Sequence, residues 1–375
     1  MTQVCIDCRY IGPRPSGIAE VVGAIVGLLP GLAPDLDFLL LSHPAHGRPL
    51  SQAPNVREVV VAHAANGPGT MWLLPRLVDL RGVDLFHAPA NILPAGLSMR
   101  TVTTIHDVMW LNHPGWCANS WTRWPDRAFY RHGLKRALNR SSHIITVSEA
   151  TRREVLDLRP ELAAKTTSCL SGVSRRFQPV APDRERLRRL GISDNVRYLL
   201  SVGQYAPYKN HEGAIRAFAS AFEGTRGIIL ILVQRQGRGA LRLRQLAEDL
   251  GISDQVQLLS AVEQDDLMHL YSGAAALLHP SFCEGFGNPL AEAMACGCPV
   301  ITSNVSAMPE VTAGAAVTVP PTDITAMATA LRSVLHDTSL ARSMRDKGLA
   351  RAQELQWSNT AARYLEVYRK VLESS

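Results

Sequence analysis

The sequence predicts an α/β protein made of two doubly wound, Rossmann-like domains that face each other across a cleft. At 375 residues the chain is longer than one ordinary core requires, which suggests about two domains. Its 46% hydrophobic and 19% charged residues are typical of soluble globular proteins. Short apolar runs alternate with longer helical patterns in two successive series, as expected for βαβ units around parallel sheets.

Each series can be followed element by element. In the first, "GIAEVVGAIVGLLPGL" predicts a helix, and six runs predict strands: "VCIDCRY", "DFLLLS", "REVVVA", "DLFHAP", "TVTTIHDV" and "HIITVSEA". The segment "SGVSRRFQPVAPDRERL" is rich in Gly, Pro and charge, which predicts a linker. In the second series a helix is expected at about 210–222, and the predicted strands are "VRYLLSVG", "GIILILVQ", "QVQLLS", "AALLHPS" and "CPVITS".

The last stretch, "LQWSNTAARYLEVYRKVLES", predicts an amphipathic helix. Its apolar positions at helical spacing are Leu355, Ala361, Tyr364, Leu365 and Tyr368. We therefore expect a first domain over 1–178, joined by the helix at 357–375, and a second domain over 179–356.

Charge and cysteine content limit the partners and the compartment. A net charge of +6 and a pI near 9.0 favour anionic partners, which include phosphate-bearing ligands, a membrane surface and nucleic acid. Seven irregularly spaced cysteines argue against a disulfide framework and for a reducing compartment. No signal-peptide pattern and no apolar run near about 20 residues is found, so we expect a cytoplasmic protein.

Two short motifs suggest metal sites but have simpler explanations. Cys5 and Cys8 form a CxxC motif in an expected buried strand, and two ligands without a second pair do not make a zinc site. Asp35 and Asp37 form a DxD motif just before a predicted strand, where capping and solvation explain them. No GxGxxG follows the first strand, which disfavours a dinucleotide-dependent dehydrogenase.

The stretch "HPSFCEGFGNPLAEAMACGCPV" places one acid in a glycine-containing loop and a second in the following helix. A strand is expected to end near Ser281, with Asn288 as the helix N-cap and Pro289 as the first helical residue. Glu292 then occupies the fourth helical position. As a simpler alternative, Glu292 could complement the helix dipole and Glu284 could be a solvated loop residue. This alternative leaves the glycines unexplained.

A ligand explains the whole stretch better. Gly285 and Gly287 allow a ligand to approach the backbone, and the helix start offers N–H groups to an anion. Carboxylates beside an anion site require a positive or hydroxyl-rich partner. A sugar nucleotide supplies phosphates for the N–H groups and hydroxyls for the acids.

The longer stretch "PSFCEGFGNPLAEAMACGCPVITSN" resembles the signature of the retaining GT4 glycosyltransferases (glycosyl transferases group 1), which have the GT-B fold. The resemblance implies that Glu284 contacts donor-sugar hydroxyls and that Glu292 accepts hydrogen bonds from the ribose. It places the diphosphate along the backbone of Phe286, Gly287 and Asn288, beside Gly285. It also implies retention of configuration with no cofactor and no essential metal.

The stretch "LLSVGQYAPYKNHEGAIRAF" is similar to the family's glycine–arginine…lysine–asparagine loop. Gly203 matches its glycine, and Lys209 would hold the diphosphate and stabilise the leaving nucleotide, although a solvated lysine is the simpler alternative. The sequence departs at Gln204, where the family usually has arginine. Either Gln204 bonds the phosphate without charge, or Arg235 or Arg238 substitutes.

Two loops of the first domain also resemble the family. "TVTTIHDVMW" matches its histidine–aspartate loop, so we expect His106 to lie against the reacting sugar as a positioning residue rather than a general base. "RYIGPRPSGIAEVV" is similar to its N-terminal glycine loop, where Gly17 would approach the β-phosphate or the acceptor and Ser16 would cap the helix. Further cleft or linker positions match at Ser148, Glu149 and Gly172.

The segment 121–140, "WTRWPDRAFYRHGLKRALNR", interleaves cations with aromatic residues. One interpretation is a basic surface that contacts anionic lipid near a lipid-linked acceptor. The other is a helix that packs its aromatics and solvates its cations. The sequence does not decide between them, and nucleic acid is the least favoured partner.

The expected function is transfer of a hexosyl group from a nucleotide-diphosphate sugar to a glycan or lipid-linked hydroxyl in bacterial polysaccharide or glycolipid assembly. The signature looks most like that of bacterial mannosyl- and rhamnosyltransferases, which favours GDP-mannose over UDP-hexoses. A sugar-nucleotide epimerase and a catalytically silent nucleotide-sugar-binding partner remain as alternatives.

Overall fold

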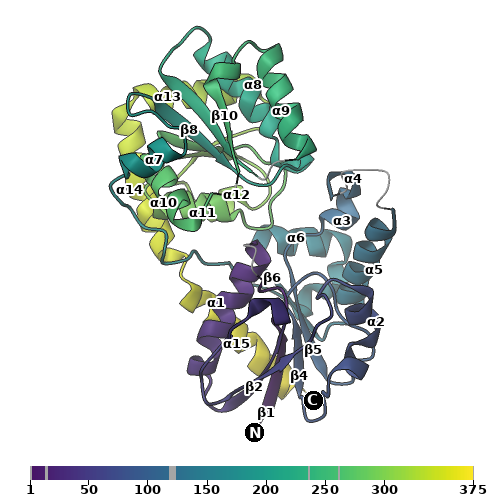
Figure 1. Ribbon diagram of the computed structural model, residues 1–375. Coiled ribbons are helices and arrows are strands. Elements are labelled where there is room, and N and C mark those ends of the chain that lie inside the picture. The colour runs from purple at the N-terminus through teal and green to yellow at the C-terminus, as the bar shows by residue number, and fades with distance from the viewer. Residues whose placement is uncertain (1, 13–15, 118–123, 235–236, 261, 375) are drawn as a thin grey trace. The chain divides into compact units, whose positions relative to one another are not determined.

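The computed structural model describes the chain except residues 1, 13–15, 118–123, 235–236, 261 and 375. It forms two compact units (Figure 1). Unit 1 comprises Met1–Gly172 and Trp357–Ser375, and unit 2 comprises Val173–Gln356. We expected the first division at 178, and the structure divides the chain after Gly172. A Cβ at Gly172 would lie 2.6 Å from the Trp357 backbone nitrogen, so only glycine fits where the two pieces of unit 1 meet.

Unit 1 contains a parallel sheet with strand order β3-β2-β1-β4-β5-β6-β7. This order contains the doubly wound 3-2-1-4-5-6 arrangement of Rossmann-type domains. Its strands are β1 Thr2–Asp7, β2 Leu36–Ser42, β3 Val56–Val60, β4 Leu85–Ala88, β5 Arg100–Ile105, β6 His143–Thr146 and β7 Thr166–Ser168.

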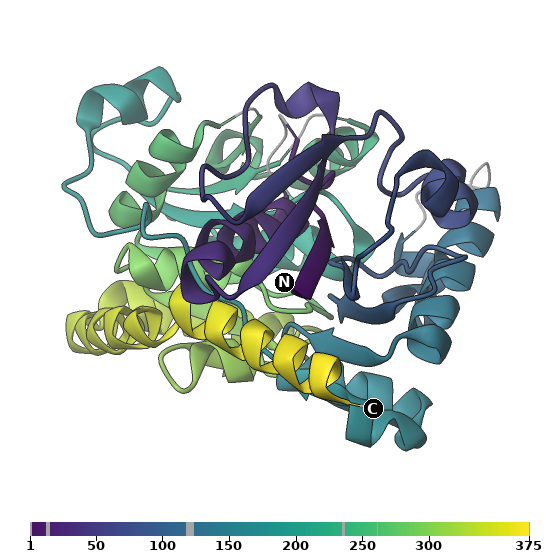
Figure 2. The same ribbon diagram turned by 90° about the horizontal axis from the view of Figure 1, so that it is seen from below.

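Helices cover both faces of this sheet. On one face, α1 (Gly17–Leu32) and α15 (Trp357–Glu373) pack against β1, β2 and β4 (Figure 2). On the other, the core is shared by α2 (Pro68–Leu77), α5 (Trp124–Arg140) and α6 (Glu149–Leu158). Two one-turn helices, α3 (Met109–Asn112) and α4 (Pro114–Cys117), precede α5. The predicted cap is confirmed, since Ser16 accepts a hydrogen bond from the Ala19 N–H at the start of α1.

A buried polar cluster fastens α15 to the sheet. The Tyr368 hydroxyl lies 2.7 Å from Nδ1 of His87 on β4, whose Nε2 lies 2.9 Å from the Thr104 hydroxyl on β5. The Tyr364 hydroxyl also reaches Thr104, at 3.2 Å. The final helix is therefore part of the first domain. It begins after Leu355, which instead ends α14, so that residue was wrongly included in the predicted helix.

Unit 2 contains a second parallel sheet, with order β10-β9-β8-β11-β12-β13. Its strands are β8 Arg197–Val202, β9 Ile228–Val233, β10 Val256–Leu259, β11 Ala276–His279, β12 Val300–Ser303 and β13 Val317–Val319. The helices are α7 Arg184–Arg189, α8 His211–Phe222, α9 Arg238–Asp249, α10 Gln264–Gly273, α11 Asn288–Ala295, α12 Met308–Thr312, α13 Ile324–His336 and α14 Thr338–Glu354.

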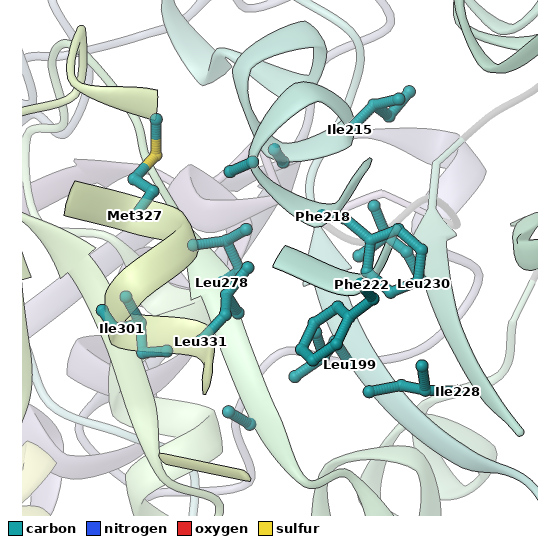
Figure 3. Packing of buried hydrophobic residues seen from close by; sticks show 14 of the residues in the cluster. Leu199, Ile215, Phe218, Phe222, Ile228, Leu230, Leu278, Ile301, Met327 and Leu331 are labelled. Carbon is teal, nitrogen blue, oxygen red and sulfur yellow. The ribbon is translucent and has the colours of Figure 1, made fainter. Parts of the chain in front are cut away.

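The core of unit 2 is built from its own strands and helices. Phe218 and Phe222 of α8 pack with Leu199, Leu230 and Leu278 of the sheet, and α13 closes the cluster (Figure 3). The predicted helix at 210–222 is confirmed, with Asn210 as its N-cap.

Three residues of the two short motifs have packing or pairing roles in the structure. Val4 and Ile6 of β1, and Cys8 directly after it, pack in the core on one face of the sheet, whereas Cys5 packs on the other face, because side chains alternate along extended chain. Asp35 pairs with Arg369 of α15 at 3.2 Å. Among the described residues no group of three or more His, Cys, Asp or Glu side chains is placed to hold a metal ion. None of the helices in the described part of the chain is long and apolar enough to cross a membrane.

Candidate functional site

The candidate site lies at the carboxyl edge of the unit 2 sheet. β8 and β11 are neighbours there, and each is followed by one of the two loops that the sequence singles out. The loops are joined by a hydrogen bond from the Phe282 N–H to the Tyr208 carbonyl, 2.7 Å. Ligands of open parallel sheets bind at this edge.

Glu284 is the centre of this edge. Three side chains converge on its Oε1: Lys209 Nζ at 2.6 Å, Ser281 Oγ at 2.7 Å and His279 Nε2 at 2.8 Å. Within the described chain no hydrogen bond is made to the other carboxylate oxygen, Oε2. The side chain is fixed through one oxygen, and the second keeps its lone pairs available to a ligand.

The charge of Glu284 is compensated inside the protein. Its side chain is 8% exposed and that of Lys209 is 12% exposed, so the pair is largely removed from water. Burial alone would raise the pKa of the Glu284 carboxyl, but the Lys209 ammonium and the His279 hydrogen bond outweigh burial and hold the pKa well below its usual range. Glu284 is therefore an acceptor of hydrogen bonds and not a proton donor near neutral pH.

Neighbouring residues hold the loop around Glu284. The Ser306 hydroxyl accepts from the Glu284 N–H at 3.2 Å and donates to the Glu284 carbonyl at 2.9 Å. Ser306 has a φ of +55°, which is uncommon for a residue other than glycine. The Thr302 hydroxyl donates to the His279 carbonyl at 2.8 Å, which ties β12 to the end of β11. The carboxylate is thus positioned by both its side chain and its backbone.

The helix that follows begins one residue earlier than predicted. α11 starts at Asn288, and its N-cap is Gly287, with no side-chain cap. Gly287 adopts a φ of +93°, a conformation that residues with a Cβ rarely adopt, so the backbone itself requires glycine here. Pro289 is then the second helical residue and Glu292 the fifth, so the predicted positions were wrong by one.

Glu292 faces a buried tyrosine. The Tyr271 hydroxyl of α10 donates to Glu292 Oε2 at 2.8 Å, and burial, with the nearby Glu292 charge, raises the pKa of Tyr271 well above its usual value. Phe286 is 5% exposed, so its side chain supports the loop and only its backbone can take part in a contact with an anion.

The β8 loop supplies the cation. Gly203 follows β8 directly with a φ of +154°, and Gln204 is exposed. Asn210 caps α8 by accepting from the Gly213 N–H, and its amide donates to the carbonyls of Pro280 and Pro321. This holds the Lys209 end of the loop against the β11 loop. Residues 235–236 and the side chain of Arg238 lie outside the described part, so the proposed substitutes for the missing arginine stay predictions.

Unpaired buried groups collect at the same edge. In the part of the chain that the structure describes, buried side-chain atoms without a hydrogen-bond partner belong to His211, Gln234 and Ser303. They follow or end β8, β9 and β12. Burial, together with Lys209 and His279, lowers the pKa of His211 to about 4. Unpaired buried polar groups are costly and uncommon, so their concentration here supports a functional site.

Unit 1 presents the other predicted residues at its own carboxyl edge. His106 follows β5, and its Nε2 lies 2.8 Å from the Pro89 carbonyl, so Nε2 must carry the proton and Nδ1 is the acceptor. Burial lowers the pKa of His106, which keeps the ring neutral. Asn91 accepts from the His106 N–H at 2.8 Å and fixes the loop. Gly17 is the first residue of α1, after β1.

Other residues of this edge are structural. Ser148 caps α6 by accepting from the Thr151 N–H, and Glu149 pairs with Arg152 at 3.0 Å. A buried pair that the sequence analysis missed lies at the end of β1: Arg9 binds both carboxylate oxygens of Asp7, the last residue of that strand, at 2.6 and 2.8 Å. Arg9 also donates to Thr70 of α2 and to the His63 carbonyl, so it fastens the loop after β1 to the start of α2.

The structure therefore brings together Gly203, Lys209, Glu284, Gly287 and Glu292 in unit 2, and places Gly17 and His106 in unit 1. The residues that were missed at the unit 2 edge are His279, Ser281, Ser306 and Tyr271. Only His279 and Ser281 could have been found from the sequence, because they end the strand before Glu284 in the motif itself. Ser306 and Tyr271 come from other elements.

Comparison with known proteins agrees with this arrangement. The family model named Glycosyl transferases group 1 matches residues 183–351, and that of Glycosyltransferase Family 4 matches 25–167. The sucrose-phosphate synthase structure from Thermosynechococcus elongatus superposes with a TM-score of 0.74 and 22% identity over 100% of both chains, which shows the fold.

Two curated relatives are mannosyltransferases of Escherichia coli. The O-antigen chain mannosyltransferase B is 30% identical over 288 residues, 76% of this chain and 74% of the relative. The serotype-specific mannosyltransferase WbdA is 25% identical over 342 residues, 88% of this chain but 40% of its own length. The chain thus spans less than half of WbdA.

Two parallel, doubly wound units with this strand-end site define a glycosyltransferase of the GT-B fold. The chain belongs to the group 1 glycosyl transferases, the GT4 family, as the sequence resemblance predicted.

Proposed function

We propose that this protein transfers a mannosyl group from GDP-mannose to a hydroxyl of a glycan or lipid-linked acceptor during bacterial polysaccharide assembly. The observation that carries the proposal is the Glu284 carboxylate, held through Oε1 with Oε2 uncommitted, next to Lys209 and the start of α11. A carboxylate, a cation and the positive end of a helix dipole match the hydroxyls and diphosphate of a nucleotide sugar. The names of the relatives support mannose.

Each group has a role in this proposal. Oε2 of Glu284 accepts hydrogen bonds from donor-sugar hydroxyls, and Glu292 accepts them from the ribose. The backbone of Gly285 to Asn288, with Gly203 and Gln204, lies along the diphosphate. Lys209 stabilises the charge that develops on the departing diphosphate.

The chemical step retains the anomeric configuration. In the front-face route, a leaving phosphate oxygen takes the proton of the acceptor hydroxyl as the new glycosidic bond forms on the same face of the sugar. Neutral His106 positions the sugar through Nδ1 and does not act as the base, and Gly17 contacts the β-phosphate or the acceptor. No cofactor and no essential metal is required, so activity should persist with a chelator.

The surroundings of the reaction follow from the same proposal. The protein works in the cytoplasm, where nucleotide sugars are made, and contacts the inner face of the membrane through segment 121–140 when the acceptor is lipid-linked. Residues 121–123 of that segment and the side chain of Trp124 lie outside the described part. Nucleic acid is not a partner.

The test is a binding screen followed by a transfer assay. GDP and GDP-mannose should raise the melting temperature more than UDP, ADP or UDP-glucose do. GDP should then be released from GDP-mannose only when an acceptor glycan is present. Epimerisation of the donor without acceptor would favour an isomerase, and donor binding without GDP release would favour a silent partner. A larger rise in melting temperature with UDP-glucose than with GDP-mannose would show that GDP-mannose is not the donor.

A further inference from the structure

Helix α2 exposes three large apolar side chains on one face. Trp72, Leu73 and Leu77 are 51%, 41% and 38% exposed, and at helical spacing they share one face with Arg76. The opposite face buries Thr70, Met71 and Leu74. Exposed apolar residues are normal when they are scattered, but three on one short helix form a patch that indicates an interaction surface.

α5 lies beside this patch (Figure 1) and supplies positive charge. The Trp72 ring lies 5.9 Å from the Phe129 ring and 6.2 Å from the His132 ring. A Cβ at Gly133 would lie 2.9 Å from the Met71 side chain, so the two helices approach closely. Arg131 and Lys135 of α5 are exposed.

The charges of the two helices are almost all of one sign. Together they contain six arginine or lysine residues and one acidic residue, Asp126. The cations are Arg76, Arg127, Arg131, Lys135, Arg136 and Arg140. An apolar patch with a tryptophan and a cationic border matches the boundary between acyl chains and anionic headgroups.

The described aromatic residues of α5, Phe129 and Tyr130, pack against other rings. Tyr130 stacks on Trp110 with ring centroids 4.7 Å apart, and Phe129 packs edge-on against Trp72 and Tyr130. The guanidinium of Arg136 donates to the Leu93 and Pro94 carbonyls. Among the described side chains of these two helices, the large apolar ones that are exposed belong to α2, a helix outside segment 121–140.

We propose that the face formed by Trp72, Leu73, Arg76 and Leu77 of α2, bordered by Arg131 and Lys135 of α5, inserts into an anionic lipid surface. A second copy of the chain is a poorer occupant, because a two-fold interface would bring this cationic patch against itself. Only the role of this lipid contact, which would bring unit 1 to a lipid-linked acceptor, rests on the proposed function. The surface itself can be tested without transfer.

The experiment is flotation of the full chain with vesicles of phosphatidylglycerol and phosphatidylcholine, compared with phosphatidylcholine alone. The wild type should bind the anionic vesicles and be released by high salt. Leu73→Ser/Leu77→Ser should lower the partition coefficient about tenfold, because it removes the inserted side chains. Arg131→Glu/Lys135→Glu should lower it by about as much.

Matched controls separate this surface from general effects. Leu241→Ser removes a leucine that is 65% exposed in unit 2, and Arg342→Glu/Lys347→Glu reverses exposed charges on α14. Both should bind vesicles like the wild type. Nucleotide-induced thermal shifts should be unchanged in all variants, so loss of nucleotide binding alone would overturn the proposed function and leave this surface standing.

Four outcomes would overturn the proposal. They are no binding of the wild type at low salt, equal binding to neutral vesicles, unchanged binding of the α2 variant, and a concentration-dependent dimer that Leu73→Ser/Leu77→Ser abolishes.

Discussion

The buried Glu284 carboxylate is stabilised as an anion by side chains from three segments. Lys209 comes from the β8 loop, His279 ends β11, and Ser281 belongs to the motif loop. Removing one partner of a buried ion pair leaves an uncompensated charge, whereas removing both charges together does not. The Lys209–Glu284 pair can therefore be separated experimentally into its structural and functional parts.

We expect Lys209→Met to lower the free energy of unfolding by about 3–5 kcal/mol, because the Glu284 carboxylate stays buried without its cation. Glu284→Gln keeps the shape and should lower the transfer rate at least about 100-fold, since a neutral amide is a weaker acceptor for sugar hydroxyls. Urea unfolding and a single-turnover transfer assay measure the two effects.

The double variant Lys209→Met/Glu284→Gln is the control. It should recover much of the stability lost in Lys209→Met while remaining inactive. If Lys209→Met were as stable as the wild type, or if either single variant transferred at a near-normal rate, the roles assigned to this pair would be wrong.

Sequence alone indicated both residues but not their contact. Glu284 stands in a motif with a recognisable pattern, and Lys209 stands at a loop-to-helix junction. They are 75 positions apart, and only the adjacency of β8 and β11 brings them within 2.6 Å. Ser306 and Tyr271 lie outside the motif, so no local pattern could have connected them to Glu284 or Glu292.

At the scale of elements, a buried histidine of β4 helps to hold α15 on the sheet. His87 on β4 is fully buried between Thr104 and Tyr368, and burial, with His106 nearby, lowers its pKa to about 3. In the unfolded chain the same ring has a pKa near 6.5. The unfolded state therefore binds a proton on this ring below about pH 6.5, while the folded state stays neutral until about pH 3.

This difference predicts how stability changes with pH. The contribution of His87 is fully present above pH 6.5 and falls by about 1.4 kcal/mol per pH unit as the pH decreases towards 3. His87→Leu loses two hydrogen bonds and should be less stable at pH 7. The difference in free energy of unfolding between this variant and the wild type should become smaller by about 1.4 kcal/mol for each pH unit from pH 6 down to pH 4. Urea unfolding at each pH measures it.

The matched control is His336→Leu, which replaces an exposed histidine at the end of α13. If the difference in free energy of unfolding between His87→Leu and the wild type stayed constant from pH 6 to pH 4, His87 would not be buried as a neutral ring.

Most elements could be predicted, and those missed have physical reasons. β2 and β9 contain long apolar runs, but β7 and β13 have three residues each, too few for a periodic signal. α11 begins at Asn288 because the backbone of Gly287 turns through positive φ, which a capping rule based on Asn and Pro does not detect. Leu355 fits the spacing of α15 but belongs to the end of α14.

At the scale of the whole molecule, the chain forms its first unit from two separate pieces. The unit 1 core includes Ala361, Tyr364, Val367, Tyr368 and Val371 of α15. Burying a large apolar side chain is worth about 1.5–3 kcal/mol, so these residues together contribute an amount comparable with the total stability of a domain, about 5–15 kcal/mol. Unit 2 draws its core from its own residues.

We therefore expect a chain that ends at Gln356 to have an unfolded unit 1 and a folded unit 2. Proteolysis should degrade the first 172 residues of this truncated chain and leave residues 173–356 intact. Residues 173–356 produced alone should give a cooperative thermal transition. A protease-resistant first unit in the absence of α15 would contradict this prediction.

The discontinuity of unit 1 also sets an order of events during synthesis. Domains usually complete their folds in the order in which they leave the ribosome. Here the strands of unit 1 emerge first, but unit 1 cannot complete its core until α15 emerges. α15 follows 184 further residues, Val173–Gln356. At 5–20 residues per second this delay is roughly 10–40 s. During that time the apolar face that α15 later covers, including Val22 and Ile25, stands open on the nascent chain, while the second unit can already close its own core. The segment that is translated second is thus the first able to finish folding.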